Sequence, residues 1–326
     1  MNTRQLRHFL AVMDLGTLSA AAEAVHLSQP ALSRSLRALE DELRAPLFDR
    51  QDRRLRPTPY ALAYADRARR IVFDEKEGAR SLALMRAGEL GPLSFGMGSS
   101  IAATLLGPMV LQLLAGAPGL RVSTLVQSSD VLVAALRAEQ VDFFIGDVRV
   151  AAQDRDLAVE PVYDCTFGWF ARKEHPLAAR QRVTSEDLAA YPLIFVGYAD
   201  ESIARRMAQL YGWALPLEEH FAINTNDVST VHMLIGASDA ITPSTDVSMV
   251  AALRAGTVTK LQVTPALDLE LTLGIVERTG RTRVPAAERA FGIVRAHFAA
   301  VARELALQRR KAASVGRRAE KRRAAP

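Results

Sequence analysis

Leucine residues recur with helical spacing near the start of the chain. Four of them are separated by four, three and four positions: Leu32, Leu36, Leu39 and Leu43. Residues with this spacing share one face of an α-helix. Ser28 precedes the run as a candidate N-cap, and Gln29 and Pro30 fall in the first turn, where proline is tolerated. The pattern therefore predicts a helix that begins just after Ser28.

A shorter helix is predicted just upstream. Ser19 is its candidate N-cap, and a run of strong helix formers follows: Ala20, Ala21, Ala22 and Ala24. Residues 25–28 interrupt the pattern, which leaves two short helices joined by a tight turn, as in a helix-turn-helix. A further helix predicted over residues 3–14 would brace this pair.

The face opposite the leucines carries side chains that can bond the edges of bases. These are Gln29, Ser33, Arg34 and Arg37, with Pro30 beside them. Gln can bond adenine bidentately, Arg can bond guanine, and Ser can bond either base. A helix-turn-helix presents such groups to the major groove from its second helix. We expect these five residues to contact DNA, and the alternative is an amphipathic helix pair whose polar face meets water.

Arginines crowd the segment that follows: Arg50, Arg53, Arg54 and Arg56. Leu47 and Phe48 precede them as an apolar anchor. This composition fits a β-wing beside a helix-turn-helix, because guanidinium groups bind phosphates and enter narrow minor grooves. We expect Arg50, Arg53 and Arg54 to contact DNA, whereas a solvated charged loop is the alternative.

A long helix is predicted over residues 58–87, with Thr58 as its cap and Pro59 at its first position. Its apolar positions alternate spacings of four and three, weakened at Glu75 and Gly78, which is similar to a coiled-coil seam. We interpret it as a helix that pairs two copies of the chain and so presents two recognition helices to two half-sites. A helix packed on its own domain is the alternative.

Short apolar runs alternate with helical patterns beyond residue 92. The expected strands are 93–98, 121–127, 143–146, 166–171, 193–196, 222–225, 240–242 and 270–276. The expected helices are 101–115, 131–140, 203–211, 228–236 and 286–307. This alternation predicts an α/β fold with a largely parallel sheet.

The first 60 residues resemble the N-terminal domain of the LysR-type transcriptional regulators. The matching positions, in order, are Phe9, Ala21-Ala22, Gln29-Pro30-Ala31-Leu32-Ser33, Leu39-Glu40, Leu43, Leu47-Phe48 and Arg50. Two positions depart from the family pattern: Arg44 and Ala61 stand where the family usually has Gly. Neither lies on the proposed DNA-contacting face, so the departures concern local turn geometry.

The resemblance implies a multi-domain α/β protein. Residues 1–58 would form a winged helix-turn-helix, 59–90 a linker and dimerisation helix, and 91–305 an effector-binding domain. That domain would consist of two α/β lobes like those of periplasmic solute-binding proteins: lobe I at about 92–163 plus 268–305, and lobe II at about 164–267. Residues 306–326 are basic and lack apolar periodicity, so we expect a disordered tail.

Candidate effector contacts lie at turns that follow predicted strands. Ser99, Ser100 and Ser128 end strands of lobe I and open helices, whose N-terminal N–H groups favour an anion. Tyr198 and Thr242 end strands of lobe II. Ligands of open α/β sheets bind at such carboxyl ends, and the family carries effector contacts there. We therefore expect these residues to bind a small effector, for example a carboxylate metabolite, with plain helix capping as the alternative.

Composition narrows the class of protein. The 326 residues suffice for two or three domains, and no apolar run reaches the ~18 residues that span a bilayer. The start lacks a signal-peptide layout, so a cytoplasmic location without membrane contact is expected. The single cysteine, Cys165, excludes an internal disulfide and a two-thiol redox switch, and we expect it to be buried.

Charge and motifs point away from catalysis. The net charge is +3 over residues 1–90, −5 over 91–300 and +7 over 301–326, so the two ends suit phosphate binding better than the middle. The six histidines have no metal-ligand spacing, and no nucleophile elbow, phosphate loop or dinucleotide fingerprint occurs. We expect no enzyme activity, no metal and no cofactor.

The sequence thus predicts a sequence-specific transcriptional regulator that acts as a homodimer or homotetramer. Its expected partners are double-stranded promoter DNA and a small effector bound between the two lobes, with RNA polymerase as a further candidate. Two other interpretations stay open. One is a solute-binding module of a transport system, and the other is an architectural DNA-binding protein whose α/β part serves assembly alone.

Overall fold

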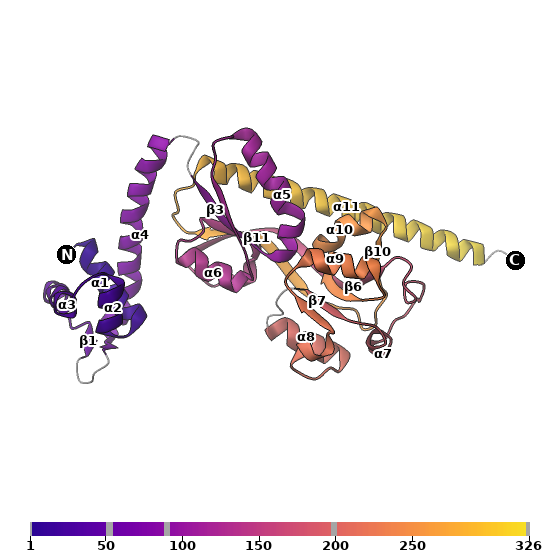
Figure 1. The fold of residues 1–326 in the computed structure, drawn as a ribbon, viewed down its shortest axis with the longest axis horizontal. Coiled ribbons are helices and arrows are strands. Elements are labelled where there is room, and N and C mark those ends of the chain that lie inside the picture. Colours follow the sequence, from indigo (N-terminus) through magenta and orange to yellow (C-terminus); the bar gives the residue numbers. More distant parts are fainter. Residues whose placement is uncertain (1, 50–54, 88–91, 197–200, 324–326) are drawn as a thin grey trace. The chain divides into compact units, whose positions relative to one another are not determined.

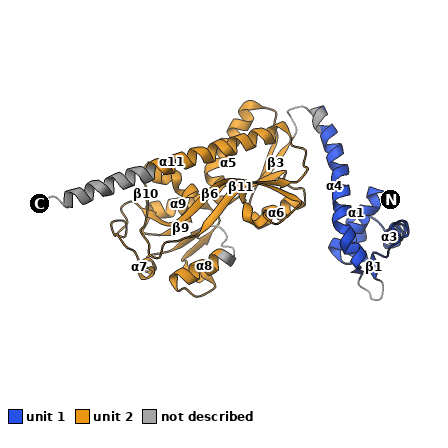
Figure 2. Ribbon diagram, turned by 180° about the vertical axis from the view of Figure 1, so that it is seen from behind, with its two compact units in different colours: residues 1–88 blue, residues 89–326 orange. Residues whose placement is uncertain are grey.

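The chain folds as two compact units, Met1–Gly88 and Glu89–Pro326 (Figure 2). The structure, a computed structural model, describes residues 2–49, 55–87, 92–196 and 201–323. Unit 1 consists mainly of helices, whereas unit 2 combines a mixed sheet with helices (Figure 1).

The described residues of unit 1 form four helices and a two-stranded ribbon. Its elements are α1 (Thr3–Leu15), α2 (Leu18–Ala24), α3 (Gln29–Leu43), β1 (Phe48–Asp49), β2 (Arg56–Pro57) and α4 (Pro59–Ala87). β1 and β2 pair antiparallel, with Phe48 opposite Pro57. The helix pair and the ribbon expected from the sequence are both present.

Side-chain caps fix where the helices of unit 1 begin. The Ser28 hydroxyl accepts a hydrogen bond from the N–H of Ala31 at 3.4 Å, so α3 begins where the sequence predicted. The cap of α2 is Thr17 and not Ser19, because the Thr17 hydroxyl accepts the N–H of Ala20 at 3.3 Å. α2 therefore begins earlier than the alanine run indicated.

One apolar core joins the helices of unit 1. Its fully buried members come from α1, α2, α3, the ribbon and α4 and include Leu6, Phe9, Ala21, Leu32, Leu39, Leu47 and Ala61. The small side chains of α2 let α1 and α3 pack close to it, because a larger side chain at these buried positions would hold the helices apart. The leucine face predicted for α3 is thus the face that holds α3 in place.

The first half of α4 packs on its own unit. α4 lies against α1, and ion pairs of Arg7 with Glu75 and of Arg69 with Asp14 (2.9 Å) link the two helices. Glu75 therefore has a partner on α1, which explains a charged residue within the expected apolar seam. Other apolar side chains of α4 stay exposed: Tyr60, Leu62, Ile71 and Leu82.

Unit 2 is built on a seven-stranded sheet in the order β10-β6-β11-β5-β3-β4, with β9 also paired to β6. The strands are β3 (Leu93–Met97), β4 (Val122–Val126), β5 (Phe143–Asp147), β6 (Leu157–Arg172), β9 (Thr242–Thr245), β10 (Val258–Lys260) and β11 (Glu270–Arg278). β3 is parallel to β4 and β5, but β11 lies antiparallel between β5 and β6. The prediction of a largely parallel sheet was wrong, because β11 pairs antiparallel with β5 and β6, and β9 and β10 also pair antiparallel with β6.

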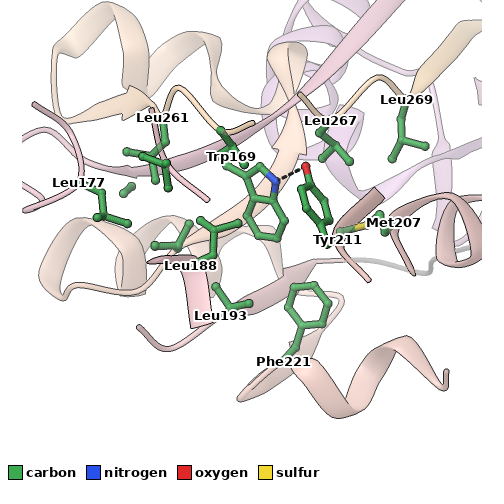
Figure 3. Close-up of a cluster of buried hydrophobic side chains, with 14 of the residues drawn as sticks. Trp169, Leu177, Leu188, Leu193, Met207, Tyr211, Phe221, Leu261, Leu267 and Leu269 are labelled. Atoms are coloured by element: carbon green, nitrogen blue, oxygen red, sulfur yellow. Dashed lines mark hydrogen bonds between the residues drawn. The ribbon is translucent and has the colours of Figure 1, made fainter. Parts of the chain in front are cut away.

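Separate apolar clusters distinguish the two lobes of unit 2. The lobe I cluster includes Leu132, Phe144 and Leu157. The lobe II cluster surrounds Trp169, whose indole N–H donates to the Tyr211 hydroxyl at 2.8 Å (Figure 3). Lobe II also holds a parallel pair, β7 (Ile194–Val196) and β8 (Ile223–Thr225). Because β6 contributes to both clusters, this strand ties the two lobes together.

Helices cover this framework. They are α5 (Ser99–Gly116), α6 (Ser129–Arg137), α7 (Ser185–Ala189), α8 (Glu201–Tyr211), α9 (Val228–Ala237), α10 (Asp246–Ala255) and α11 (Pro285–Arg323), with short 3-10 turns at Val148–Ala151 and Leu217–His220. By length and composition α5 alone, among the described residues, is apolar enough to cross a membrane. Its buried face, including Leu105 and Met109, packs within unit 2, and α5 lies against α10 and α11.

The C-terminal segment differs from the expectation. Residues 306–323 continue α11 as helix, although the sequence predicted a disordered tail there. Ala, Arg, Lys and Glu dominate this segment and are all strong helix formers, so the segment extends the preceding helix without an apolar face of its own.

The left-handed backbone of Arg44 yields a stability prediction. Arg44 ends α3 with φ 51°, a conformation that costs most non-glycine residues ~1–2 kcal/mol. We expect Arg44→Gly to stabilise the end of α3 by about 1 kcal/mol, because glycine adopts this conformation freely. Hydrogen exchange of the α3 amides in the full chain should slow accordingly.

Gly16→Ala is the reverse substitution at another left-handed helix end and serves as a control. Gly16 ends α1 with φ 69° and nothing lies near a side chain placed there, so Gly16→Ala should destabilise through backbone strain alone. Faster exchange in α3 of the Arg44→Gly variant would contradict the assigned strain.

Candidate functional sites

The first candidate site is the exposed face of α3. Gln29, Pro30, Arg34 and Arg37 are exposed and Ser33 is half-buried, while Leu32, Leu36 and Leu39 on the other face are buried. The polar residues expected to contact DNA therefore lie together on the surface of one helix. Their separation from the leucines follows directly from the helical period.

Contacts from α1 hold this helix at its middle. His8 Nδ1 and the Ser35 hydroxyl of α3 lie 2.7 Å apart and share a hydrogen bond. Burial lowers the pKa of His8, and the nearby Arg4 charge lowers it further, so the imidazole is neutral at physiological pH. A neutral side chain at this place avoids burying a charge beside the leucine core.

Glu40 joins the end of α3 to the ribbon. One carboxylate oxygen accepts the backbone N–H groups of Leu47 at 2.9 Å and of Phe48 at 3.2 Å. Leu47 and Phe48 are themselves buried in the unit 1 core. The ribbon therefore starts from a fixed position beside α3, and Arg56 on its second strand is exposed. Arg50, Arg53 and Arg54 lie outside the described residues.

The second candidate site is a cavity of about 570 Å³ in unit 2. Lobe I lines it with residues at the carboxyl ends of β3, β4 and β5, and lobe II lines it from β6, β7, α8 and the β9–α10 junction. Residues 269–273 form a further wall. A cavity of this size is typical of a small-molecule site, and it lies between the two lobes.

The structure brings most of the predicted effector residues to this cavity. Ser99, Ser100 and Ser128 line it. Thr242 is fully buried and is not among the lining residues, whereas Ser244 and Thr245 are. The sequence placed the end of this strand at residue 242, but β9 continues to Thr245, so its carboxyl end lies three residues later. Tyr198 lies outside the described residues.

Several lining residues were missed by the sequence analysis. Gln127 precedes Ser128 in the same strand-to-helix turn, so the rule that selected Ser128 would have included it. The apolar wall, which includes Phe167, Leu271 and Leu273, had no such signal. Alternating apolar residues in a strand indicate a buried face but not what that face meets.

The helix starts at the cavity have free polar groups. Neither α5 nor α6 has a side-chain cap, and the Ser99, Ser100 and Ser128 hydroxyls form no hydrogen bond with the described part of the chain. The carboxylate of Asp147 is occupied, because it accepts hydrogen bonds from the backbone and guanidinium of Arg149 at 2.7–3.0 Å.

Cys165 lies next to this region but is not a free surface thiol. It is buried, and its S–H donates to the backbone carbonyl of Leu271 at 3.2 Å. Burial, together with the nearby Asp246 carboxylate, raises the pKa of the thiol well above its usual range. Cys165 is therefore a buried structural residue, as the sequence predicted.

Both units match known domains. Residues 3–62 match the family described as bacterial regulatory helix-turn-helix protein, lysR family, and residues 86–299 match the LysR substrate binding domain. The chain belongs to the LysR family of transcriptional regulators. The resemblance found in the N-terminal sequence is confirmed, and unit 2 is a substrate-binding domain of that family. The protein is thus a DNA-binding transcriptional regulator modulated through an effector-binding domain.

Relatives of this LysR-type regulator span most of its length. It is 33% identical over 295 residues to the SDS degradation transcriptional activation protein of a Pseudomonas species, covering 89% of this chain and 94% of that one. It is 31% identical to the regulator GbpR of Rhizobium radiobacter, covering 73% and 79% respectively. A full-length OxyR structure from Pseudomonas aeruginosa shares the fold, with a TM-score of 0.54, 23% identity, and 90% and 95% of the two chains covered.

The bonds of Glu40 predict that it stabilises unit 1. We expect Glu40→Ala to lower the free energy of unfolding by about 1–3 kcal/mol, because the Leu47 and Phe48 N–H groups lose their acceptor. Glu40→Gln should recover part of the loss because an amide oxygen can still accept. Urea denaturation of the full chain, followed by circular dichroism, measures both.

Asp41→Ala is the matched control, because Asp41 is exposed and its side chain forms no hydrogen bond with the described residues. It should change stability by less than about 0.5 kcal/mol. Equal effects of the Glu40→Ala and Asp41→Ala substitutions would show that Glu40 does not hold the ribbon.

Proposed function

We propose that this regulator reads promoter DNA with the exposed face of α3. Gln29, Ser33, Arg34 and Arg37 would contact base edges in the major groove, and Pro30 would pack beside them. The single observation that supports this best is the two-sided character of α3, with polar groups exposed and leucines buried. The ribbon tied to α3 by Glu40 would bring Arg50, Arg53, Arg54 and Arg56 to the phosphates or the minor groove.

The effector would bind in the cavity between the lobes. Two uncapped helix starts and three free serine hydroxyls there can hold an anionic group, because the N-terminal N–H groups and the helix dipole both favour negative charge. Thr242 and Tyr198 stay candidates from the sequence alone. The residues that the geometry favours in lobe II are Ser244 and Thr245.

Regulation would follow from the lobes' response to the ligand. A ligand that contacts both lobes binds one arrangement of them more tightly than another and so shifts the population toward it. The ratio of the ligand's affinities for the two lobe arrangements sets the largest change in their populations that the ligand can produce. In an oligomer, a change in lobe arrangement would alter the spacing of the two recognition helices relative to two DNA half-sites. Transcription would change as a result.

Assembly as a homodimer or homotetramer is part of this proposal. Exposed apolar side chains support it, since they are left uncovered in a single chain: Leu62 and Leu82 on α4, and Leu111 on α5, which is 71% exposed. Two-fold pairing would supply the two recognition helices that a palindromic operator needs. RNA polymerase would be a further partner, and the site of action would be the cytoplasm.

Arg34 tests the DNA-reading role. If its guanidinium bonds a guanine bidentately, Arg34→Ala should weaken binding by about 1–3 kcal/mol and relax the base preference at one position. The measurement is fluorescence anisotropy at fixed salt with a duplex that the protein selects from a random pool. Arg254→Ala, an exposed arginine on α10, is the control and should leave affinity unchanged. Unaltered affinity of the Arg34→Ala variant would remove Arg34 from the interface.

Ser99 tests the effector site. A panel of mono- and dicarboxylates of graded chain length should include compounds that raise the melting temperature of the full chain. For those compounds we expect Ser99→Ala to weaken binding about tenfold, because a hydrogen bond to a charged group is lost, while DNA affinity is unchanged. Ser229→Ala, at an exposed serine of α9, should bind normally. Equal binding by both variants would contradict an anion site at α5.

A further inference from the structure

The walls of the effector cavity differ in chemistry. The polar side chains gather mostly at the helix starts of lobe I, where Ser99, Ser100, Gln127 and Ser128 lie. The wall that lobe II and residues 269–273 supply is mainly apolar and includes Phe167, Phe195 and Met207. Such a division is expected for a ligand with one polar end and one apolar end, since each end is then desolvated only against groups of its own kind.

A row of leucines leads away from the polar end. Leu273, Leu271 and Leu269 alternate along β11 and the residue before it, so they present their side chains to the same side. Leu273 pairs in register with Asp147 at the end of β5, which places it at the polar end of the cavity. Leu269 belongs to the lobe II core with Met207 (Figure 3).

The length of this leucine row sets the length of the apolar part of a ligand that lies along it. Four residues of extended strand separate Leu273 from Leu269, which corresponds to about 13 Å. A straight hydrocarbon chain of about ten carbons has the same length, given carbon–carbon bonds of about 1.5 Å. A cavity volume of about 570 Å³ is ample for such a chain and its head group.

Ser244 lies beside the cavity, but its hydroxyl does not face it. The residue is among the lining residues, whereas its side-chain oxygen is fully buried. The polar side chains that a ligand can reach are therefore mainly those at the starts of α5 and α6.

The charges at the cavity limit the ligand to at most one negative charge, which the starts of α5 and α6 would stabilise. No Lys or Arg occurs among its described lining residues, so a second anionic group would have no cation to pair with. Asp147 is already bound by Arg149, and the remaining lining carboxylate, Asp130, is exposed. The helix starts can stabilise one anionic head group, but a charge at the leucine end would be buried without a partner.

We propose that the effector is a monoanionic amphiphile, with a carboxylate or sulfate head group at the starts of α5 and α6 and a hydrocarbon chain of about ten carbons along Leu273, Leu271 and Leu269. This inference rests on the cavity being the effector site. It adds the chemical class of the ligand, which excludes short dicarboxylates, polyols and cations.

Isothermal titration of the full chain tests the class directly, with all ligands kept below their micelle concentrations. The series hexanoate, octanoate and decanoate should show affinity rising about threefold for each added methylene. Decyl sulfate and decanoate are the two head-group sources and should both bind, with one molecule per chain and a raised melting temperature. Decanedioate should bind at least about tenfold more weakly than decanoate, and decyltrimethylammonium should not bind.

Two substitutions test where the ligand's hydrocarbon chain lies within the cavity. Leu271→Asn keeps the side-chain size but places an amide in the leucine row. In this variant, affinity should no longer rise with the length of the ligand's hydrocarbon chain. Leu307→Asn is the matched control at an exposed leucine of α11 and should leave that rise intact. Ser99→Ala should weaken decanoate and decyl sulfate alike, because the head group of each loses a hydrogen bond.

The outcomes separate the two proposals. Binding of short dicarboxylates in preference to decanoate, with loss in the Ser99→Ala variant, would overturn the amphiphile and keep the effector site. Binding of decanoate that is unchanged in the Leu271→Asn and Ser99→Ala variants would place it elsewhere and overturn both proposals. Several molecules bound per chain with a lowered melting temperature is detergent action and also overturns the inference.

Discussion

The antiparallel pairing of β6 with β11 is the constraint on which unit 2 depends. β6 begins in the lobe I cluster at Leu157 and ends in lobe II beyond Trp169, while β11 pairs with it from Leu157 to Thr166. Two strands that share a continuous ladder cannot separate without losing many backbone hydrogen bonds at once. The lobes are therefore joined at these two strands, and both lobes line one cavity.

The two lobes contribute cavity walls of different chemical character. Lobe I brings the ends of parallel strands and the starts of α5 and α6 to the cavity, where free N–H and hydroxyl groups suit a charged head group. Lobe II contributes apolar side chains, and covering them with an apolar ligand group is favourable because it removes apolar surface from water. A ligand that touches both walls has a reason to favour one lobe arrangement, which is the physical requirement for a regulator that senses a small molecule.

The sequence predicted what local rules govern and missed what depends on distant partners. The leucine face of α3 and the Ser28 cap were predicted correctly because period and capping act within one turn. The length of β6 and the antiparallel return of β11 were missed, since strand pairing depends on residues over a hundred positions apart, such as Leu271 and Cys165. The end of β9 was misplaced for the same reason, so Thr242 was chosen where Ser244 and Thr245 line the cavity.

The central claim is that one small molecule bridges the two lobes of this LysR-type regulator. Hydrogen exchange of the full chain, measured with and without saturating decanoate, tests it most directly. Bridging predicts slower exchange in the lobe I segments at residues 98–101 and 127–130 together with the lobe II segment at 243–247. Slower exchange confined to one lobe, or to segments outside the cavity, would contradict the account.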